Sequence, residues 1–451
     1  MRIELPAVVL RAIELLERNG HEAYAVGGCV RDRLLGRTPN DWDITTSALP
    51  EETAACFAEF RTVETGIRHG TLTVIIDGTP LEITTFRNDG EYADNRHPIQ
   101  VTFSSRPEDD LSRRDFTVNA MAYHPEKGLL DLFDGQKDLQ NRIISCVGDP
   151  TTRFSEDGLR ILRAIRFASV LEFTLDEPTS RAVHAQKALL KNIAAERIRE
   201  EFCKLIMGAG AVTILREYSD VIGVFLPEIL PSIGFEQNSR YHVFDVYEHS
   251  LQALSHTNGD LVTRLALYLH DIGKPSVYTE DEDGGHFKGH GAVSTKQTAE
   301  IMKRLRFDNE TAAAVTQLVD YHDRDFPAEE RAVKRLMCKM SDENIFRLME
   351  IQRCDRLAHA KEYSEPKPSV WEIPRLVQSI RASNACLSLK TLAVKGGDLA
   401  SIGIPPGKEM GKLLATLLEK VIDGELPNEK DVLLEYAKII TTRPTGGMHK
   451  G

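Results

Sequence analysis

The sequence predicts an α/β domain at the start of the chain, followed by regions that are almost entirely α-helical. Residues 1 to about 125 combine one amphipathic helix pattern with several short strand patterns. From about residue 150 onward, nearly every segment carries apolar residues at i, i+3 and i+4 spacing, which is typical of helices. A length of 451 residues allows two to four domains of ordinary size.

The first domain is predicted to contain one helix and at least four strands. Residues 6–19 have the periodicity of an amphipathic helix. Asp77 and Gly78 separate two strand segments and are typical of a hairpin turn. Residues 88–101 are polar and aperiodic, which indicates a loop. The strand patterns themselves lie at residues 22–27, 41–46, 71–77 and 81–87.

The helical part is predicted to divide into three regions. Its clearest helix patterns lie at residues 156–170, 190–208 and 211–220. A His-rich helical stretch follows, and three prolines within residues 362–374 indicate a break after it. The predicted boundaries are 1–125 for the α/β head, 126–235 for a helical neck and body, 241–360 for the His-rich domain and 375–451 for a helical tail.

The composition is that of a globular protein, with 41% hydrophobic and 27% charged residues. No apolar run reaches the roughly 18–20 residues of a membrane span, and the N-terminal segment is amphipathic rather than signal-like, so we expect a cytoplasmic protein. Seven scattered cysteines without a CxxC pair favour reduced thiols. The net charge of −12 argues weakly against a nucleic-acid partner, but arginines cluster locally, and binding depends on such clusters.

Asp41 and Asp43 place two carboxylates one residue apart in a predicted strand. Because residues i and i+2 of a strand face the same side, the carboxylates would lie together while Trp42 and Ile44 face a core. Two anions this close repel unless a cation lies between them, and oxygen ligands suit Mg²⁺. Glu82, on another predicted strand, is a candidate third ligand. An isolated pair of this kind is more often an exposed strand face than a metal site. The assignment of a metal site therefore depends on the surrounding residues.

Gly27 and Gly28 lie between a predicted strand and a predicted helical stretch. Such a turn lets backbone N–H groups approach a triphosphate, and the start of the helix favours the same anion. Arg31 would lie in the first helical turn and face the same phosphates. Together with the acidic residues, these parts describe two-metal nucleotidyl transfer, in which one ion activates a hydroxyl and the other stabilises the leaving pyrophosphate.

Three segments in this order resemble the nucleotidyltransferase superfamily and, more narrowly, the bacterial CCA-adding enzymes and poly(A) polymerases. They are GGCVRDRLLGRTPNDWDI at 27–44, LSRRDFTVNAMA at 111–122 and EDGLRILRAIRFA at 156–168. The resemblance implies a polymerase β-like head and an enzyme that adds CCA to the 3′ end of tRNA from CTP and ATP with Mg²⁺. It leaves open two related activities, a tRNA A-adding enzyme and a poly(A) polymerase.

The resemblance assigns residues 111–122 to nucleotide binding, and their pattern is read as a helix. The arginines would bind phosphate or sugar, and the acid and amide would brace the site; the plainer alternative is an exposed basic turn. The residues concerned are Arg113, Arg114, Asp115 and Asn119.

Asp157, Arg160, Arg163 and Arg166 recur every three residues and would form a slowly winding polar stripe on a helix. Cytosine and adenine both carry an amino donor beside a ring-nitrogen acceptor, so a carboxylate next to a guanidinium matches both bases. Guanine and uracil present the opposite pattern, and one bidentate contact is worth about 1–3 kcal/mol. The resemblance assigns Asp157 and Arg160 this role, and the other two arginines would bind phosphate or hold the template. A salt-bridged helix face is the alternative.

The loop at residues 89–98 bears on how much of the CCA end is added. In the resembling family, enzymes that add only CC lack this loop, whereas A-adding and CCA-adding enzymes both retain it. Its presence therefore does not separate the latter two.

His249, His270, Asp271 and Asp355 form a second constellation, which resembles the HD phosphohydrolase superfamily. Imidazoles and carboxylates on helices suit a divalent metal with positions open to water. His290 and His322 are candidates for a second metal. Single buried histidines are usually structural, but several beside aspartates favour a metal site and allow hydrolysis. This leaves a further alternative, a metal-dependent phosphohydrolase whose head merely binds RNA.

The tail at 375–451 resembles the C-terminal region of CCA-adding enzymes, which contacts tRNA. It contains few basic residues, so its own composition supports that contact only weakly.

Overall fold

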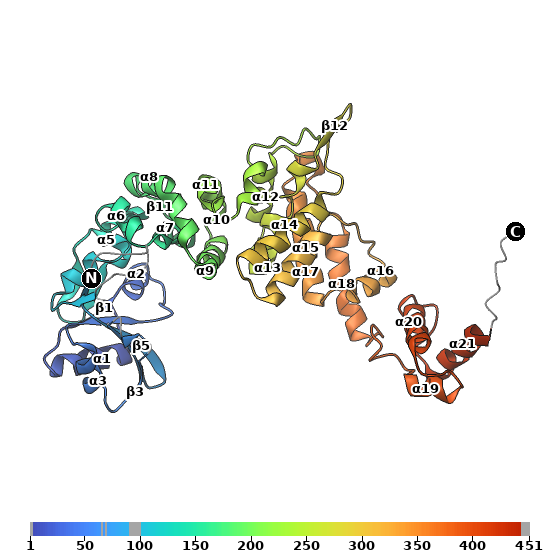
Figure 1. Ribbon diagram of the computed structural model, residues 1–451, viewed down its shortest axis with the longest axis horizontal. Helices are drawn as coiled ribbons and strands as arrows, with labels where there is room; N and C mark the ends of the chain where they lie inside the picture. Colours follow the sequence, from blue (N-terminus) through green and yellow to red (C-terminus); the bar gives the residue numbers. More distant parts are fainter. Residues whose placement is uncertain (1–2, 65, 68–69, 90–100, 443–451) are drawn as a thin grey trace. The chain divides into compact units, whose positions relative to one another are not determined.

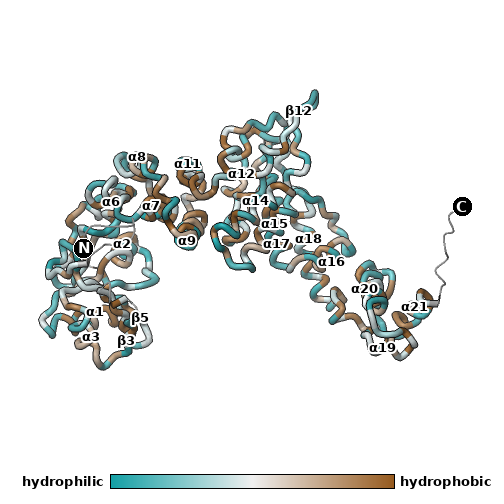
Figure 2. The backbone as a smooth tube through the Cα atoms, viewed as in Figure 1, coloured by the Kyte–Doolittle hydropathy of each residue, from teal (hydrophilic) through white to brown (hydrophobic). Residues whose placement is uncertain are grey.

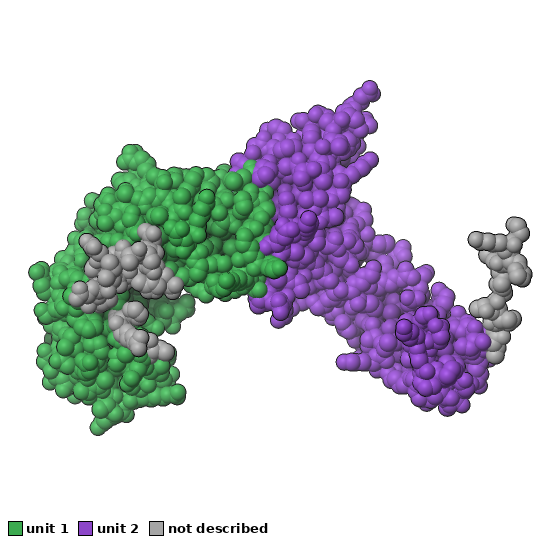
Figure 3. All heavy atoms as spheres, in the orientation of Figure 1, with its two compact units in different colours: residues 1–230, 301–307 green, residues 231–300, 308–451 purple. Residues whose placement is uncertain are grey.

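The computed structural model describes residues 3–64, 66–67, 70–89 and 101–442. The described chain divides into two compact units, which Figure 3 colours separately. The first contains residues 1–230 and 301–307, and the second contains residues 231–300 and 308–451. The predicted loop at 89–98 lies almost entirely outside the described residues. Among the described residues, no helix combines the length and the hydropathy that a membrane-spanning segment requires.

The first unit begins with a seven-stranded sheet in the order β3-β4-β5-β2-β1-β8-β9 (Figure 1). Neighbouring strands are antiparallel except for β2 and β5, which are parallel. The helices α1 (Ala7–Arg18) and α3 (Pro50–Cys56) pack against this sheet. The strands are β1 (Ala23–Val26), β2 (Asp43–Thr46), β3 (Arg61–Val63), β4 (Thr71–Ile76), β5 (Thr79–Thr85), β8 (Met121–His124) and β9 (Gly128–Asp131).

Local sequence signals account for several of these elements. Every second residue of β4 is buried, as the alternating pattern predicts. Asp77 and Gly78 both have positive φ, 49° and 81°, which is the geometry of a two-residue type I′ hairpin turn between β4 and β5. The predicted helix at 6–19 and the four predicted strands are all present, and an α/β head followed by helical regions is confirmed.

The prediction of one helix over residues 111–122 is wrong. Helix α4 (Pro107–Ser112) ends as this segment begins, a short 3₁₀ turn covers Thr117–Asn119, and Met121–His124 form strand β8. Strand β8 pairs with both β1 and β9, and all four of its residues are buried. Its backbone groups therefore find partners in the sheet, which outweighs the local helical pattern.

Helices make up most of the rest of the first unit. Figure 2 shows hydrophobic residues concentrated on α7 (Leu159–Leu171) and α9 (Ala195–Ile206), which pack against each other. The other helices are α2 (Gly28–Leu34), α5 (Gly135–Asn141), α6 (Pro150–Glu156), α8 (Glu177–Gln186), α10 (Ala211–Glu217) and α11 (Ser219–Ile222). Two short strand pairs, β6 (Arg87–Asp89) with β7 (Val101–Phe103) and β10 (Ile143–Ile144) with β11 (Thr174–Leu175), complete it.

The predicted single helix over 156–170 is interrupted near its start. Helix α6 ends at Glu156, and α7 begins at Leu159. Asp157 between them has an extended backbone, with φ −136° and ψ 104°, and its side chain accepts a hydrogen bond from the Leu159 N–H. An aspartate satisfies a free N–H at a helix start in this way, so Asp157 precedes the helix rather than lying on it.

The described residues of the second unit are helical apart from one hairpin, β12 (Thr279–Asp281) with β13 (Gly284–His286). The predicted break at 362–374 is shorter than expected, because α18 begins at Ser369 and contains Pro374. A separate hydrophobic cluster that includes Leu399, Leu417 and Leu433 holds the last three helices. The helices are α12 (Val246–Ser255), α13 (Leu261–Leu269), α14 (His290–Arg304), α15 (Asn309–Tyr321), α16 (Glu330–Met337), α17 (Asp342–Leu357), α18 (Ser369–Ala382), α19 (Gly396–Ser401), α20 (Lys408–Ile422) and α21 (Lys430–Thr442).

Candidate active site

Three carboxylates gather where the parallel strands β2 and β5 lie side by side. Asp43 opens β2 and lies directly opposite Glu82 of β5. Asp41 is exposed and precedes the strand, so the prediction that both aspartates share one strand holds only for Asp43. Burial, Asp41 and Glu82 raise the pKa of Asp43 to about 6, although Arg114 opposes the rise. The three acids therefore act on one another electrostatically, as a cation site requires.

Gly27 forms the turn between β1 and α2. Its φ is 82°, a left-handed conformation that favours glycine, and α2 begins at the next residue. A Cβ atom on Gly27 would lie 2.7 Å from Nη1 of Arg114. The predicted glycine turn is thus present, and the absence of a side chain lets a guanidinium lie against the backbone.

A fully buried carboxylate, Asp110, holds the two arginines of the 111–122 segment. Arg113 donates to it through Nε at 3.0 Å and Nη2 at 2.6 Å, and Arg114 donates through Nη2 at 3.3 Å. The Thr45 hydroxyl of β2 donates to the same carboxylate at 3.1 Å. Burial alone would raise the pKa of Asp110, but Arg114 and Arg113 lower it below its usual value. Asp110 therefore ties both arginines to the strand that carries Asp43.

A line of hydrogen bonds connects α2 with α7. Arg31 donates to Oδ1 of Asn119 at 2.6 Å, and the Asn119 amide donates to Oδ1 of Asp115 at 3.2 Å. Arg163 of α7 donates to Oδ2 of Asp115 through Nε at 2.8 Å and Nη2 at 2.5 Å. Burial would raise the pKa of Asp115, but Arg163 and the hydrogen bonds lower it to about 2. Four predicted nucleotide-binding residues thus form one network.

Arg160 is anchored by groups that precede it in the chain. Its Nη1 donates to Glu156 Oε2 at 2.5 Å and to the Arg153 carbonyl at 3.2 Å, and its Nη2 donates to the Arg113 carbonyl at 3.2 Å. Its backbone N–H donates to the carbonyl of Asp157 at 2.9 Å, so these two predicted base-selecting residues lie within one turn. Arg160 therefore lies between α6 and the segment that carries Arg113.

Arg166, the last residue of the predicted stripe, faces helix α9. Its Nε donates to Oε2 of Glu201 at 2.7 Å, and both side chains are about nine-tenths buried, with 11% and 8% exposed. This pair lies within the packed interface of α7 and α9, so the structure gives Arg166 a role in holding the helix. Sequence reasoning missed four partners: Asp110, Glu156, Arg197 and Glu201. Arg197 and Glu201 meet their partners only through the fold. Asp110 and Glu156 lie three or four residues from the arginines they bind, a helical spacing that could have revealed them.

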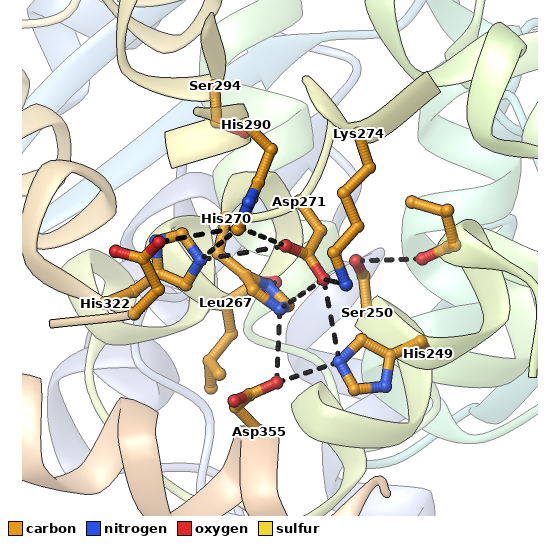
Figure 4. A network of polar contacts seen from close by, with 12 residues as sticks. His249, Ser250, Leu267, His270, Asp271, Lys274, His290, Ser294, His322 and Asp355 are labelled. Carbon is orange, nitrogen blue, oxygen red and sulfur yellow. Dashed lines mark hydrogen bonds and ion pairs between the residues drawn. The ribbon is translucent and has the colours of Figure 1, made fainter. Parts of the chain in front are cut away.

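The second unit brings six predicted metal ligands together, and Figure 4 shows their side chains pointing toward one another. His249, His270 and Asp355 form one group, and Asp271, His290 and His322 form the other; within each group the ligand atoms lie within 4.8 Å of one another. Among the described residues, these two groups meet this criterion, and Asp41, Asp43 and Glu82 of the first unit are not among them.

Backbone carbonyls orient three of the four imidazoles of the cluster. The Nδ1 atoms of His270, His290 and His322 lie 2.7, 2.9 and 2.6 Å from the carbonyls of Leu267, Phe287 and Val319. An Nδ1–H that donates to a carbonyl leaves the Nε2 lone pair directed into the site, as in metal-bound histidines. The Nε2 atom of His270 is buried and faces the carboxylates of Asp271 and Asp355.

Asp271 joins the two groups of ligands. Its Oδ1 lies 3.3 Å from His290 Nε2, and its Oδ2 lies 3.1 Å from His270 Nε2 and 2.7 Å from Lys274 Nζ. Burial would lower the pKa of His270, but Asp271 and Asp355 raise it to about 10. Carboxylates that favour a cation this strongly suit a divalent ion. A cavity of about 690 Å³ opens beside the cluster, and its lining includes Arg240, Lys274 and Lys288.

Comparisons with known proteins match both parts of the chain. Residues 23–145 match a family model described as the poly A polymerase head domain. Residues 172–230 match one described as "Probable RNA and SrmB-binding site of polymerase A", and residues 290–437 match a model for a second domain of tRNA nucleotidyltransferases.

Relatives of known name extend over nearly the whole chain. The CCA-adding enzyme of Limosilactobacillus reuteri is 35% identical over 447 residues, 97% of this chain and 98% of that protein. The CCA-adding enzyme of Lactobacillus helveticus is 34% identical, over 96% and 98% of the two chains. The crystal structure of the Bacillus stearothermophilus CCA-adding enzyme in complex with CTP aligns with a TM-score of 0.71, at 28% identity over 96% and 97% of the two chains. Given this similarity and the acidic site beside the Gly27 turn, the chain is a nucleotidyltransferase that belongs to the CCA-adding enzyme family.

Proposed function

We propose that this enzyme adds C, C and A in turn to the 3′ end of tRNA, with CTP and ATP as donors. The observation that carries the proposal is the position of Asp43 opposite Glu82, on the strand that Asp110 connects to Arg113 and Arg114. The relative from Bacillus stearothermophilus was solved with CTP, which supports the choice of substrate.

CCA-adding enzymes use a divalent metal, and Asp41, Asp43 and Glu82 would hold Mg²⁺ here. The residues fit such an ion, because all three are oxygen donors and their mutual repulsion contributes to the raised pKa of Asp43. When bound, the metal lowers the pKa of the attacking hydroxyl and neutralises charge on the phosphates.

The chain's own residues position the two reactants. The 3′-hydroxyl oxygen of the tRNA forms a bond to the α-phosphorus while the bond from that phosphorus to the pyrophosphate oxygen breaks; the hydroxyl proton passes to solvent. Arg31 and Arg114 lie next to the turn at Gly27 and Gly28, where their charge would hold the triphosphate. Arg113 binds the other carboxylate oxygen of Asp110, and its positive charge would also attract the triphosphate.

Asp157 and Arg160 would read the base. The Asp157 carboxylate would accept from the amino group that cytosine and adenine share, and Arg160 would donate to the neighbouring ring nitrogen. A single bidentate contact of this kind discriminates by about 1–3 kcal/mol, enough for roughly a tenfold to hundredfold preference. Arg163, held by Asp115, would fix the helix that carries this pair.

Three tRNA transcripts test the proposal: one that ends before the CCA sequence, one that ends in CC and one that ends in CCA. Each is incubated with labelled CTP or ATP, Mg²⁺ and the purified enzyme. The proposal predicts two cytidines and one adenosine on the first transcript, one adenosine on the second and nothing on the third. Adenosine on the CC end alone would identify an A-adding enzyme, and a long adenosine tract would identify a poly(A) polymerase.

A second activity, metal-dependent phosphohydrolysis in the second unit, is supported by the six clustered ligands, in which the buried Nε2 of His270 lies 3.1 Å from Asp271 and 3.5 Å from Asp355. His249, His270 and Asp355 would hold one divalent ion, and Asp271, His290 and His322 a second. A bound ion would supply a hydroxide for attack on phosphorus. The cationic residues Arg240 and Lys288 in the cavity lining would attract a phosphate group.

His270→Ala and Asp43→Ala separate the two activities. The first variant should lose hydrolysis of p-nitrophenyl phosphate in the presence of Mn²⁺ or Mg²⁺ and keep nucleotide addition, and the second should do the reverse. If the wild-type enzyme hydrolyses none of this substrate with any divalent metal tried, the second activity is contradicted while CCA addition stands. If Asp43→Ala retained nucleotide addition, the assignment of Asp43 to the metal site would be wrong. If the wild-type enzyme hydrolysed the phosphate ester but added no nucleotide, it would instead be a phosphohydrolase with an RNA-binding head.

The tail at 375–451 is proposed to contact tRNA, and the enzyme is proposed to act in the cytoplasm, where CTP, ATP and immature tRNA are present. Footprinting of a bound tRNA with and without the tail tests the first point.

A further inference from the structure

The helix α9 places a guanidinium against the proposed base-reading carboxylate. Arg197, in the first turn of α9, donates from Nη2 to Oδ2 of Asp157 at 3.1 Å. The other oxygen, Oδ1, accepts from the Leu159 N–H at 3.0 Å. Both oxygens of the carboxylate therefore accept a hydrogen bond, one from the backbone N–H of Leu159 and one from Arg197, 40 positions away.

The same contacts leave the carboxylate able to bind a ligand. A carboxylate has about four lone-pair sites, and these two hydrogen bonds use half of them. Its side chain is 18% exposed, so part of it still faces solvent. These two hydrogen bonds fix the side-chain torsions of Asp157 but leave some of its acceptor positions open.

The position of Arg197 is not the one expected if its ion pair with Asp157 served only to stabilise the fold. Its Nη1 atom is inaccessible to solvent and has no hydrogen-bond partner among the described residues. A buried donor without a partner destabilises a fold, so contact with Asp157 comes at a cost in stability. The neighbouring pair between Arg166 and Glu201 already joins α9 to α7.

We propose that Arg197 is a positioning residue for nucleotide selection: it holds the Asp157 carboxylate where it meets the amino group of cytosine or adenine. This inference rests on the proposed role of Asp157 in base reading. Without Arg197, the carboxylate is free to rotate about the Leu159 contact. It then accepts from the ring N–H of guanine or uracil as readily as from an amino group, and discrimination falls.

The test measures kcat/KM for single-nucleotide addition by the full-length enzyme. A transcript ending in CC is supplied with ATP or GTP, and a transcript ending before CCA is supplied with CTP or UTP. Arg197→Gln should lower both preferences at least about tenfold, chiefly by raising the use of GTP and UTP. Arg197→Lys should restore part of the preference, because its ammonium reaches the same carboxylate without the planar fork.

Two further variants make the outcome decisive. Arg181→Gln removes an exposed arginine that pairs with Glu177 on α8, and it should leave both preferences unchanged. Asp157→Asn should lower both preferences by itself. If Asp157→Asn lowers them and Arg197→Gln reduces all four nucleotides equally, the inference about Arg197 is overturned and base reading by Asp157 stands. If Asp157→Asn leaves the preferences intact, the proposed base reader is wrong, and the inference fails with it.

Should Arg197→Gln not fold, an unchanged preference in Arg197→Lys together with a folded melting curve overturns the proposal, and an intermediate preference supports it.

Discussion

Asp43 and Glu82 lie directly opposite each other on the parallel strands β2 and β5, the one parallel pair in the described seven-stranded sheet. This pairing brings an acid from residue 43 next to one that follows 39 positions later, which no short motif encodes. The raised pKa of Asp43, about 6, follows from burial together with Asp41 and Glu82. The same repulsion underlies the proposal that a divalent cation binds at this strand pair.

Gly27→Ala should impair nucleotide addition more than a loss of stability explains. The new Cβ would lie 2.7 Å from Nη1 of Arg114, so this guanidinium must move away from the proposed triphosphate site. We expect kcat/KM for CTP to fall at least about tenfold, in addition to a strain of about 1–2 kcal/mol at positive φ. The measurement is steady-state kinetics with a thermal melt of the same preparation.

Gly36→Ala is the matched control. Gly36 also has positive φ, 71°, but nothing lies within 4 Å of its Cβ position. Gly36→Ala should show the loss of stability that positive φ causes, with near wild-type kinetics. Equal kinetic defects in the two variants would argue against the Arg114 contact as the cause.

Asp110→Ala should be among the most destabilising single changes in the first unit. It removes a fully buried carboxylate and leaves the charges of Arg113 and Arg114 without that partner. Breaking a buried ion pair from one side costs roughly 3–5 kcal/mol. Urea unfolding measures the change, and Glu108→Ala, which removes a half-exposed acid, should have little effect. A small change in Asp110→Ala would mean that the buried network relaxes without it.

Stability should depend on Asp115 in a defined pH window. Its pKa is lowered from 3.8 to about 2 in the folded enzyme, through Arg163 and hydrogen bonds that outweigh burial. A lowered folded pKa contributes stability that is present above the unfolded value and is lost as pH falls from about 4 toward 2. The contribution is about 2.5 kcal/mol, at about 1.4 kcal/mol for each pKa unit.

Asp115→Asn removes this titration. The difference in unfolding free energy between wild type and this variant should therefore be larger at pH 6 than at pH 3, as measured by urea denaturation. A difference that stays constant across this range would show that Asp115 keeps its ordinary pKa.

The histidine cluster should bind divalent metal independently of nucleotide addition. Titration calorimetry with Mn²⁺ on the Asp43→Ala background should detect binding that His270→Ala weakens at least about tenfold. His256→Ala, at an exposed histidine outside the cluster, should bind as the parent does. EDTA should lower the melting temperature of the parent, because a metal that binds only the folded state stabilises it. Equal binding in all variants would place the metal elsewhere.

Features that depend on residues close in sequence were predicted correctly. The Asp77–Gly78 hairpin, the turn at Gly27 and helix α1 each follow from a local signal, and all are present. The 111–122 segment was read wrongly because strand β8 pairs with β1, almost a hundred residues earlier in the chain, as well as with the neighbouring β9.

The site was predicted only in part, because some of its features follow from local sequence and others depend on the fold. Individual ligands such as His249 and Asp355 stand out by residue type and motif, so their grouping was foreseeable. The partners that orient the site were not: Asp110 looks like any acid in a first helical turn, and Arg197 like any arginine on an amphipathic helix. Their roles arise from burial and from contacts that only the folded chain creates.

The most direct test of the central claim is nucleotide addition by Asp43→Ala. A transcript that ends before CCA is incubated with CTP, ATP and Mg²⁺, while binding of the same tRNA and the melting temperature are measured on the same preparation. We expect a folded variant that still binds tRNA and adds no detectable nucleotide. A folded Asp43→Ala enzyme that completes the CCA end at close to the wild-type rate would contradict it.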